Sequence, residues 1–377
     1  MFGKLKFPNT SIRNRFRFIL NAHYSSVKKN RNKKKTFSSF EFYAIFQIMK
    51  LTINEIAEMA HVAKSTVSKA INGQKGVSES NRQRILEIIQ QVNFQPNVSA
   101  RALAQSRTGA IGVVLPHAVT SLSGTFWATV VSAVAAEANR HNNSLMVISP
   151  QEGEKLKLET LEAIVNRHCV DGLIIGAEQV QSQTIMNVLL QDIPFVFIGK
   201  NQFLDHYAVD VTNRKSALNV TEQLIARGYK KIGCIAGPEN YKYIKERVQG
   251  FKDALEKAGL DSSRTAYSDY KKESAVKTAS AFFEQHKDID ALFLAAGGEF
   301  VLNVMEALKS SGRDLKSIGL GVFDDNRIFD FLDWSIVAAR QPVEKMAQCA
   351  AGMLFEIING NPPEKKYNCF DAEIVVH

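Results

Sequence analysis

Between residues 64 and 72 the sequence carries a run of cationic and small hydrogen-bonding side chains with no acidic residue among them. Such groups can donate hydrogen bonds to phosphate oxygens and to base edges without repelling the phosphate backbone. The run therefore predicts a surface that enters the major groove of double-stranded DNA. Its polar members are Lys64, Ser65, Thr66, Ser68, Lys69 and Asn72.

Two short amphipathic helices position this run, because apolar residues recur at three- and four-residue steps on either side of a three-residue break. The recurring residues are Ile53, Ile56, Ala57 and Ala60 in the first helix and Val67, Ala70 and Ile71 in the second. Thr52 can cap the first helix, with Glu55 as its capping-box partner. We predict a helix-turn-helix over Thr52–Asn72 and a third helix, Ser80–Val92, that covers the other two. Two helices alone would also fit an ordinary helical hairpin.

Several motifs in fixed order make the interpretation specific. They are T-I-x-x-I-A from Thr52, V-A-K-S-T-V-S-K-A-I-N from Val62, F-Q-P-N from Phe94, A-R-A-L-A from Ala100 and I-G-V-V-L-P from Ile111. Residues 51 to about 116 thereby resemble the lactose-repressor family of bacterial transcription regulators. The resemblance implies a homodimer that reads a near-palindromic operator, with one recognition helix in each major groove.

The resemblance also implies a hinge helix that folds on DNA and presses a leucine, matched here by Leu103, into the central minor groove. We divide the N-terminal part into a helix-turn-helix domain at 49–95 and a hinge at 96–107. The predicted DNA contacts outside the second helix are Thr52, Ile53, Ser78, Asn97, Ser99, Ala100 and Leu103.

Positive charge is concentrated at the start of the chain, whose 377 residues carry a formal net charge of +9. Residues 1–48 hold eleven Lys or Arg against the single acid Glu41, and residues 49–107 hold eight against four acids. A basic head on an acidic body fits DNA binding by the head. We expect residues 1–48 to be a disordered basic leader or the product of a start site placed too far upstream. The alternative is a basic arm that grips phosphates.

Other classes of protein find little support in the sequence. No span approaches the roughly 20 apolar residues of a membrane helix. The four cysteines have no paired spacing, which favours reduced thiols in the cytoplasm over zinc ligands or disulfides. We see no P-loop, dinucleotide fingerprint, nucleophile elbow or metal constellation, so we expect no enzyme and no cofactor.

From Thr108 onward apolar strand-like runs alternate with helical patterns, which predicts an α/β body with parallel sheets. The predicted strands are Ile111–Leu115, Leu145–Ser149, Gly172–Gly176, Phe195–Ile198, Lys231–Ala236, Ala291–Ala295 and Ile318–Phe323. The predicted helices are Thr129–Asn139, Lys155–Arg167, Lys215–Ala226, Glu246–Ala258, Ser274–Gln285 and Val301–Ser310.

We expect this body, residues 108–377, to divide in two, with the chain crossing near Asp210 and again near Ala338. One subdomain would take about 108–210 plus 338–370, and the other 211–337 plus the C-terminal end. The family resemblance implies the same architecture, in which two subdomains similar to periplasmic sugar-binding proteins hold a ligand in the cleft between them.

Ligands of parallel sheets bind beyond the carboxyl ends of the strands. Phe126 and Trp127 fall on paired aromatic residues of the family, and Trp127 can stack on a sugar ring. The alternative is that Trp127 lies in the core or at an interface. Lys200, after the fourth predicted strand, matches a position where the family often has a basic residue.

Two further positions come from motifs of the family. Arg247, in E-R-V-Q-G-F-K-D-A-L, matches an arginine that faces the cleft and hydrogen-bonds ligand through its planar fork. Asp324, in V-F-D-D-N, matches an aspartate that accepts bonds from ligand hydroxyls or amines. Asp325 beside it fits a cap or turn residue.

The sequence departs from the family at Gly297 and Gly298, where an Asn-Asp pair is usual. Two adjacent glycines can form a nest of free amides that faces an anion. With Arg247 and Lys200 nearby, this pair favours a carboxylate- or phosphate-bearing sugar.

Taken together, these features predict a sequence-specific DNA-binding regulator, a repressor of carbohydrate-utilisation genes. Its effector would be a sugar, sugar acid or sugar phosphate bound in the body. The alternative, a sugar-binding protein without a regulatory role, explains only the body.

Overall fold

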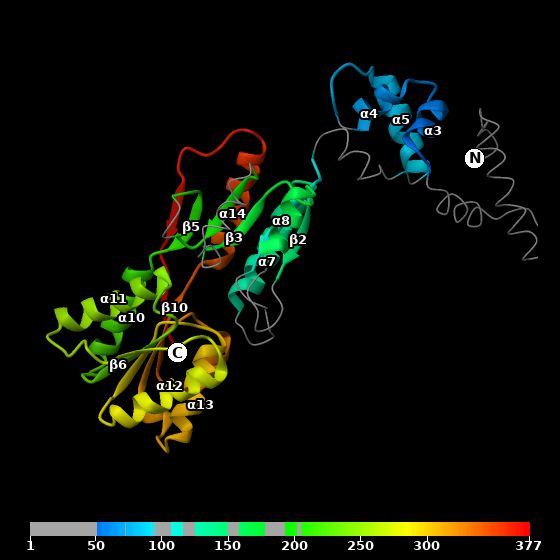
Figure 1. The fold of residues 1–377 in the computed structure, drawn as a ribbon. Helices are drawn as coiled ribbons and strands as arrows, with labels where there is room; N and C mark the ends of the chain where they lie inside the picture. The colour runs from blue at the N-terminus through cyan, green and yellow to red at the C-terminus, as the bar shows by residue number, and fades with distance from the viewer. Residues whose placement is uncertain are drawn as a thin grey trace, which may run out of the picture. The chain divides into compact units, whose positions relative to one another are not determined.

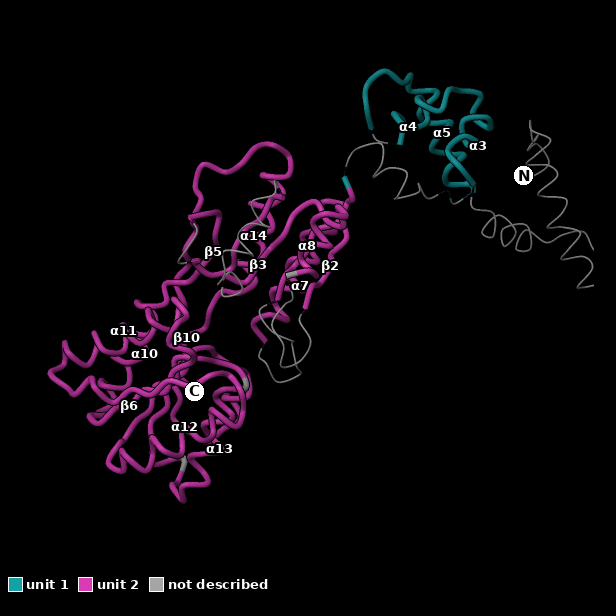
Figure 2. The backbone as a smooth tube through the Cα atoms, viewed as in Figure 1, with its two compact units in different colours: residues 1–107 teal, residues 108–377 magenta. Residues whose placement is uncertain are grey.

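The computed structural model describes most of the chain, which divides into two compact units. The head is Met1–Arg107 and the body is Thr108–His377 (Figure 2). The described residues are 51–71, 73–92, 94, 107–115, 125–149, 158–177, 193–201 and 205–377. The predicted leader and some predicted DNA contacts lie outside them. Those contacts are Asn72, Asn97, Ser99, Ala100 and Leu103.

In the described part of the head, three helices form the predicted helix-turn-helix and its covering helix (Figure 1). They are α3 (Ile53–Met59), α4 (Lys64–Ile71) and α5 (Glu79–Gln91). Thr52 and Glu55 make the predicted capping box at the start of α3, because the Thr52 amide donates to the Glu55 carboxylate over 2.6 Å. The periodic apolar residues meet in one small core. Its buried members are Ile56, Ala57, Ala60, Val67, Ala70, Ile85 and Val92.

Within the described residues, six strands form the first sheet of the body, in the order β11-β5-β4-β3-β1-β2, and every neighbouring pair is parallel. All residues of β3, β4 and β5 are buried, as expected for strands covered on both faces. The strands are β1 (Ala110–Val114), β2 (Ser144–Ile148), β3 (Leu173–Gly176), β4 (Phe195–Ile198), β5 (Ala208–Val211) and β11 (Tyr367–Phe370).

The second sheet, again counted over the described residues, has six strands in the order β12-β10-β9-β8-β6-β7. Its pairs are parallel except for β10 with β12, which is antiparallel. The strands are β6 (Ile232–Ala236), β7 (Thr265–Tyr267), β8 (Ala291–Leu294), β9 (Gly319–Phe323), β10 (Ile336–Arg340) and β12 (Glu373–Val376).

Helices cover both sheets. On the first sheet α14 packs against β3, β4 and β5 and lies beside α7; on the second, α10 pairs with α11 and α12 with α13 (Figure 1). In the part of the chain that the structure describes, no helix is long and apolar enough to cross a membrane. The helices are α7 (Thr125–Arg140), α8 (Leu158–Asn166), α10 (Asn213–Ala226), α11 (Lys242–Lys257), α12 (Lys272–Gln285), α13 (Glu299–Ser310) and α14 (Val343–Ile358), with the 3₁₀ turns η2 (Leu315–Ser317) and η3 (Arg327–Phe331).

The chain passes between the two sheets in three places. The first crossing joins Val211 of β5 to α10, and the third joins β11 to β12. The second crossing follows Arg340, close to Ala338, near which we predict it. Ala338 is fully buried inside β10, a strand of the second sheet, and the chain leaves that sheet only at Gln341-Pro342. Proline cannot donate a ladder hydrogen bond, so it ends the strand there.

Gly250 sets the close packing of α11 on α10. A Cβ at this position would overlap the backbone carbonyl of Arg214 and lie 3.0 Å from the amide nitrogen of Leu218. We expect Gly250→Ala to lower the free energy of unfolding by roughly 1–3 kcal/mol in urea titrations, because one of two backbones must move.

Gly352, inside α14, is the matched control for this change, because a Cβ there meets nothing within 4 Å. Gly352→Ala should stabilise the protein by about 0.5–1 kcal/mol through helix propensity. Equal effects of the two substitutions would contradict the packing argument.

Candidate DNA-binding surface and effector site

The exposed face of α4 carries the predicted recognition residues. Lys64, Ser65 and Lys69 are exposed and Thr66 and Ser68 are half-buried, whereas Val67 and Ala70 on the opposite side are in the core. No acid lies in α4. The helix therefore presents hydroxyl and ammonium groups, and its own N-terminal amides, to a phosphate-lined groove.

Arg82 of α5 holds the end of this helix in place. Its guanidinium donates to the backbone carbonyl of Ala70 over 3.1 Å and to that of Gln74 over 2.6 Å. These bonds fix the turn that follows α4 against the covering helix. We did not predict this role for Arg82, because the sequence pattern of a polar helix face does not distinguish an arginine that bonds to the backbone from one that is simply solvent-exposed.

Three predicted DNA contacts have structural roles in the head. Thr52 is engaged with Glu55, and the hydroxyl of Ser78 accepts a bond from the amide of Asn81 as the N-cap of α5. Ile53 is half-buried against the head core. These three residues remain predicted contacts, but each already contributes to folding.

In the body, Arg247 of α11 is buried, with 6% of its surface exposed, and lies at the carboxyl edge of the second sheet. Its Nε donates to Oδ1 of Asn213 over 2.9 Å, and Nη1 donates to the carbonyl of Ala295 over 3.2 Å. The guanidinium carbon lies 3.6 Å from the ring centre of Phe323 and 4.9 Å from that of Tyr243. Two directed hydrogen bonds and two aromatic contacts thus fix the position of the guanidinium.

Asp324 directly follows β9 and accepts a hydrogen bond from the side-chain amide of Gln341. Burial raises the pKa of Asp324, and the positive charge of Arg247 opposes that shift. The structure thus brings together Arg247 and Asp324, a donor and an acceptor. Gln341 was not predicted; its position after β10, a strand that we missed, is the signal that would have found it.

Gly297 lies against Asp324, which changes the interpretation of the glycine pair. A Cβ on Gly297 would lie 2.7 Å from Oδ2 of Asp324, and Gly298, with φ of 64°, precedes α13. Because a carboxylate fills the space beside Gly297, an anion there would be repelled. The geometry disfavours the anion nest that we had predicted and explains why glycine is needed.

Asp210 brings a second buried carboxylate to the site from the end of β5. It accepts from the amide of Lys200 over 2.9 Å, from the amide of Val211 over 2.8 Å and from Nδ2 of Asn213 over 3.2 Å. Burial raises the pKa of Asp210, and these hydrogen bonds and Arg247 oppose the shift. Burial and the charge of Asp210 also raise the pKa of Glu246. We predicted neither acid, because a single polar residue in a short apolar strand, such as Asp210, or on a charged helix, such as Glu246, gives no distinctive pattern.

The remaining predicted effector residues, Lys200, Phe126 and Trp127, differ in how far their side chains are exposed for ligand contact. The Lys200 side chain is exposed and lies 4.8 Å from the ring centre of Tyr367. Trp127 is only 6% exposed and belongs to the body core, with half-buried Phe126 against it at 5.4 Å between ring centres. The burial of Trp127 favours its alternative role as a core residue, because a stacking ring must expose one face.

Aromatic rings that we did not predict extend from Tyr243, whose ring contacts the guanidinium of Arg247. Tyr241 and Tyr243 stack at 5.7 Å, the hydroxyls of Tyr243 and Tyr270 lie 2.6 Å apart, and Tyr270 meets Phe300 edge-on at 5.9 Å. Tyr270 is 38% exposed. These residues follow the ends of β6, β7 and β8, so the rule on strand ends could have found them.

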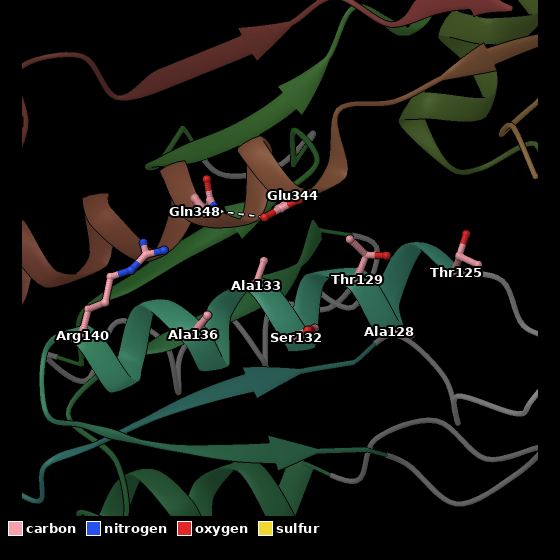
Figure 3. Close-up of a pocket in the computed structure, with 9 residues that line it drawn as sticks. All are labelled: Thr125, Ala128, Thr129, Ser132, Ala133, Ala136, Arg140, Glu344 and Gln348. Carbon is pink, nitrogen blue, oxygen red and sulfur yellow. Dashed lines mark hydrogen bonds between the residues drawn. The ribbon is translucent and has the colours of Figure 1, made fainter.

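A shallow groove runs between α7 and α14 (Figure 3). Small side chains of α7 form one wall, and Glu344 and Gln348, hydrogen-bonded to each other over 3.2 Å, form the other. None of the predicted effector residues lines it. The groove shares no lining residue with the polar and aromatic cluster around Arg247.

A helix-turn-helix head joined to a body of two parallel sheets, with a polar cluster at their carboxyl edges, defines a ligand-responsive DNA-binding regulator. Residues 108–362 match the periplasmic binding proteins and sugar binding domain of the LacI family, and residues 52–97 match the bacterial regulatory proteins of the lacI family. The chain belongs to the LacI family and is a DNA-binding transcriptional regulator.

Relatives agree with this assignment. The chain is 26% identical to the HTH-type transcriptional regulator CelR of Thermobifida fusca, covering 86% of this chain and 97% of that protein. It is 25% identical to catabolite control protein A of Priestia megaterium, and the match covers 82% of this chain and 93% of that protein. The lac repressor dimer bound to operator and an anti-inducer shares the fold, with a TM-score of 0.70, 21% identity, and coverage of 87% of this chain and 98% of that one.

Proposed function

We propose that the protein is a repressor of carbohydrate-utilisation genes that binds its operator as a homodimer through α4. In this proposal a small sugar, bound at the cluster around Arg247 and Asp324, controls operator binding. The protein acts without catalysis, in keeping with relatives that are transcription regulators.

The observation that carries the proposal is the composition of the cluster. Arg247 donates, the carboxylate of Asp324 accepts, and Gln341 offers both kinds of group, while Tyr243 and Tyr270 supply aromatic faces. A sugar needs directed donors and acceptors for its hydroxyls and an apolar face for its ring carbons. Nη2 of Arg247 makes no hydrogen bond to the described residues, so it has capacity for a ligand.

The charge of the cluster favours a neutral sugar over the sugar acid or sugar phosphate that we had included. Asp210, Glu246 and Asp324 lie around a single buried guanidinium, and each has its pKa raised by burial. Burial thus already disfavours the charged form of each carboxyl, and a bound anion nearby would disfavour it further. A structure titled as a complex of CelR with cellobiose has the same fold, at a TM-score of 0.63 and 24% identity over 86% of this chain.

The test has two arms. The wild-type protein selects its operator from random-sequence DNA, and cellobiose, maltose and ribose are then screened for a rise in melting temperature and for a change in operator affinity. We expect one neutral sugar to raise the melting temperature and to change operator affinity. Its phosphorylated form should have neither effect. A protein that selects no sequence, or that responds only to phosphorylated sugars, would contradict the proposal.

Leu103, in the A-R-A-L-A motif, provides a prediction for the hinge. An apolar wedge unstacks a base step at a cost of a few kcal/mol, which the contacts of the bent DNA offset. We therefore expect Leu103→Ala to weaken operator binding about ten-fold or more while changing affinity for random DNA little. Gel-shift titrations with both DNAs measure the ratio. An equal loss on the two DNAs would assign Leu103 to packing alone.

A further inference from the structure

A continuous line of hydrogen bonds runs through the buried part of the body. The amide of Lys200 donates to Asp210 over 2.9 Å, Nδ2 of Asn213 donates to Asp210 over 3.2 Å, and Nε of Arg247 donates to Oδ1 of Asn213 over 2.9 Å. Arg247 in turn donates to the carbonyl of Ala295. The three side chains at the centre, Asp210, Asn213 and Arg247, are 5%, 2% and 6% exposed.

This line joins the two sheets at their first crossing. Asp210 belongs to β5 of the first sheet, and Asn213 is the first residue of α10, which packs on β9 and β10 of the second. Ala295 directly follows β8 of the second sheet. A displacement of the Arg247 guanidinium must therefore strain or break a bond that leads directly to the connecting segment.

The chemistry of the central residue is specific. A side-chain amide offers a donor and an acceptor at once, so Asn213 can donate a hydrogen bond to a carboxylate through Nδ2 and accept one from a guanidinium through Oδ1. An alanine would leave a buried acid and a buried arginine each short of a partner, and such unpaired buried charges are costly. Asn213 also donates to the carbonyl of Val211 over 3.2 Å, which orders the crossing itself.

We propose that Asn213 is a positioning residue, which orients the guanidinium of Arg247 for the effector and relays effector binding through Asp210 to the first crossing. The inference rests on the proposed role of Arg247 as an effector ligand. A ligand bound to Nη2 displaces the guanidinium of Arg247. Because the side-chain amide of Asn213 is hydrogen-bonded to both groups, the carboxylate of Asp210 in β5 is displaced as well. Effector occupancy and the geometry of the crossing are thereby linked by three hydrogen bonds.

The test compares two substitutions in the full chain. Asn213→Ala should lower affinity for the sugar found among cellobiose, maltose and ribose by about ten-fold or more, because the fork loses its acceptor. Asn213→Asp restores the acceptor but sets a second carboxyl group against Asp210, so it should recover only part of that affinity. It lacks the donor to Asp210, so the change in operator affinity on adding sugar should stay impaired. Calorimetry and gel-shift titration measure the two quantities.

A matched control separates this role from a structural one. Thr221, also buried in α10, donates only within its own helix to the carbonyl of Ala217. Thr221→Val should leave both sugar affinity and operator response as in the wild type. If Asn213→Ala also keeps wild-type sugar affinity and operator response while Arg247→Ala loses sugar binding, the proposed role of Asn213 is wrong, but the proposed effector site is supported. If Arg247→Ala also binds sugar normally, the proposed site fails.

Amide hydrogen exchange tests the relay without any sugar. The amides of Lys200 and Val211 both donate to Asp210. In Asn213→Ala they should exchange faster than in the wild type and in Thr221→Val, because the carboxylate has lost a partner that holds it. Unchanged exchange at both amides would overturn the relay.

Discussion

Arg247→Ala is expected to abolish the influence of the effector on operator binding. Two bonds hold the guanidinium flat at the edge of the second sheet, and removal of a charged hydrogen-bonding group should weaken sugar binding by about 10- to 100-fold. A ligand shifts a conformational equilibrium only by its difference in affinity between the two states. Operator affinity without sugar should stay unchanged, since all the predicted DNA contacts lie in the head and Arg247 lies in the body. Gel-shift titration with and without sugar measures both.

The substitution also removes the countercharge of buried Asp210 and Asp324, so a second variant guards against a folding defect. Arg247→Lys keeps the charge but loses the planar fork and should lose most of the response. Arg214→Ala is the matched control, because Arg214 has 61% of its side chain exposed and pairs with Asp253. A wild-type response in Arg247→Ala would place the effector elsewhere.

Thr66→Glu is expected to weaken operator binding by about 100-fold or more, because it sets a carboxylate on the groove-facing side of α4. An acid in the first turn of a helix is favourable for helix stability, so the loss should not come from unfolding. The thermal midpoint should stay unchanged and the sugar response of the body should persist.

Gln90→Glu makes the same change of charge at an exposed position near the end of α5. Operator affinity of this control should fall by less than about three-fold, since a single charge away from the groove acts only through screened repulsion. Equal losses in Thr66→Glu and Gln90→Glu would show a general charge effect and would remove α4 as the reading surface.

Most continuous apolar strands of the two sheet cores were predictable from the sequence, although β10, which is equally apolar and buried, was missed. The core strands β3, β4, β8 and β9 are continuous apolar runs, and each was predicted within one or two residues. The strands β5, β7, β10, β11 and β12 were missed. They include edge strands such as β7 and β11, whose residues are half-buried or exposed and show weak contrast with the loops around them.

The residues of the proposed effector site were predictable only where they fall within a family motif. Arg247 and Asp324 were found through family motifs, and the structure brings both to one cluster. Asn213 and Asp210 were missed because a polar residue at the start of a helix or inside a strand usually serves a cap or a turn. Only the fold shows that Asn213 joins Asp210 of β5 to Arg247 of α11 by hydrogen bonds.

The order of strands in the two sheets bears on how the protein is made. The first sheet is complete only when β11 pairs with β5, and the second only when β12 pairs with β10. Residues 367–376 must therefore leave the ribosome before either sheet gains its last strand. Until then β5 and β10 present unpaired edges in the nascent chain, and such edges invite pairing with other chains. Pairing of this segment therefore covers two strand edges that would otherwise be open to aggregation.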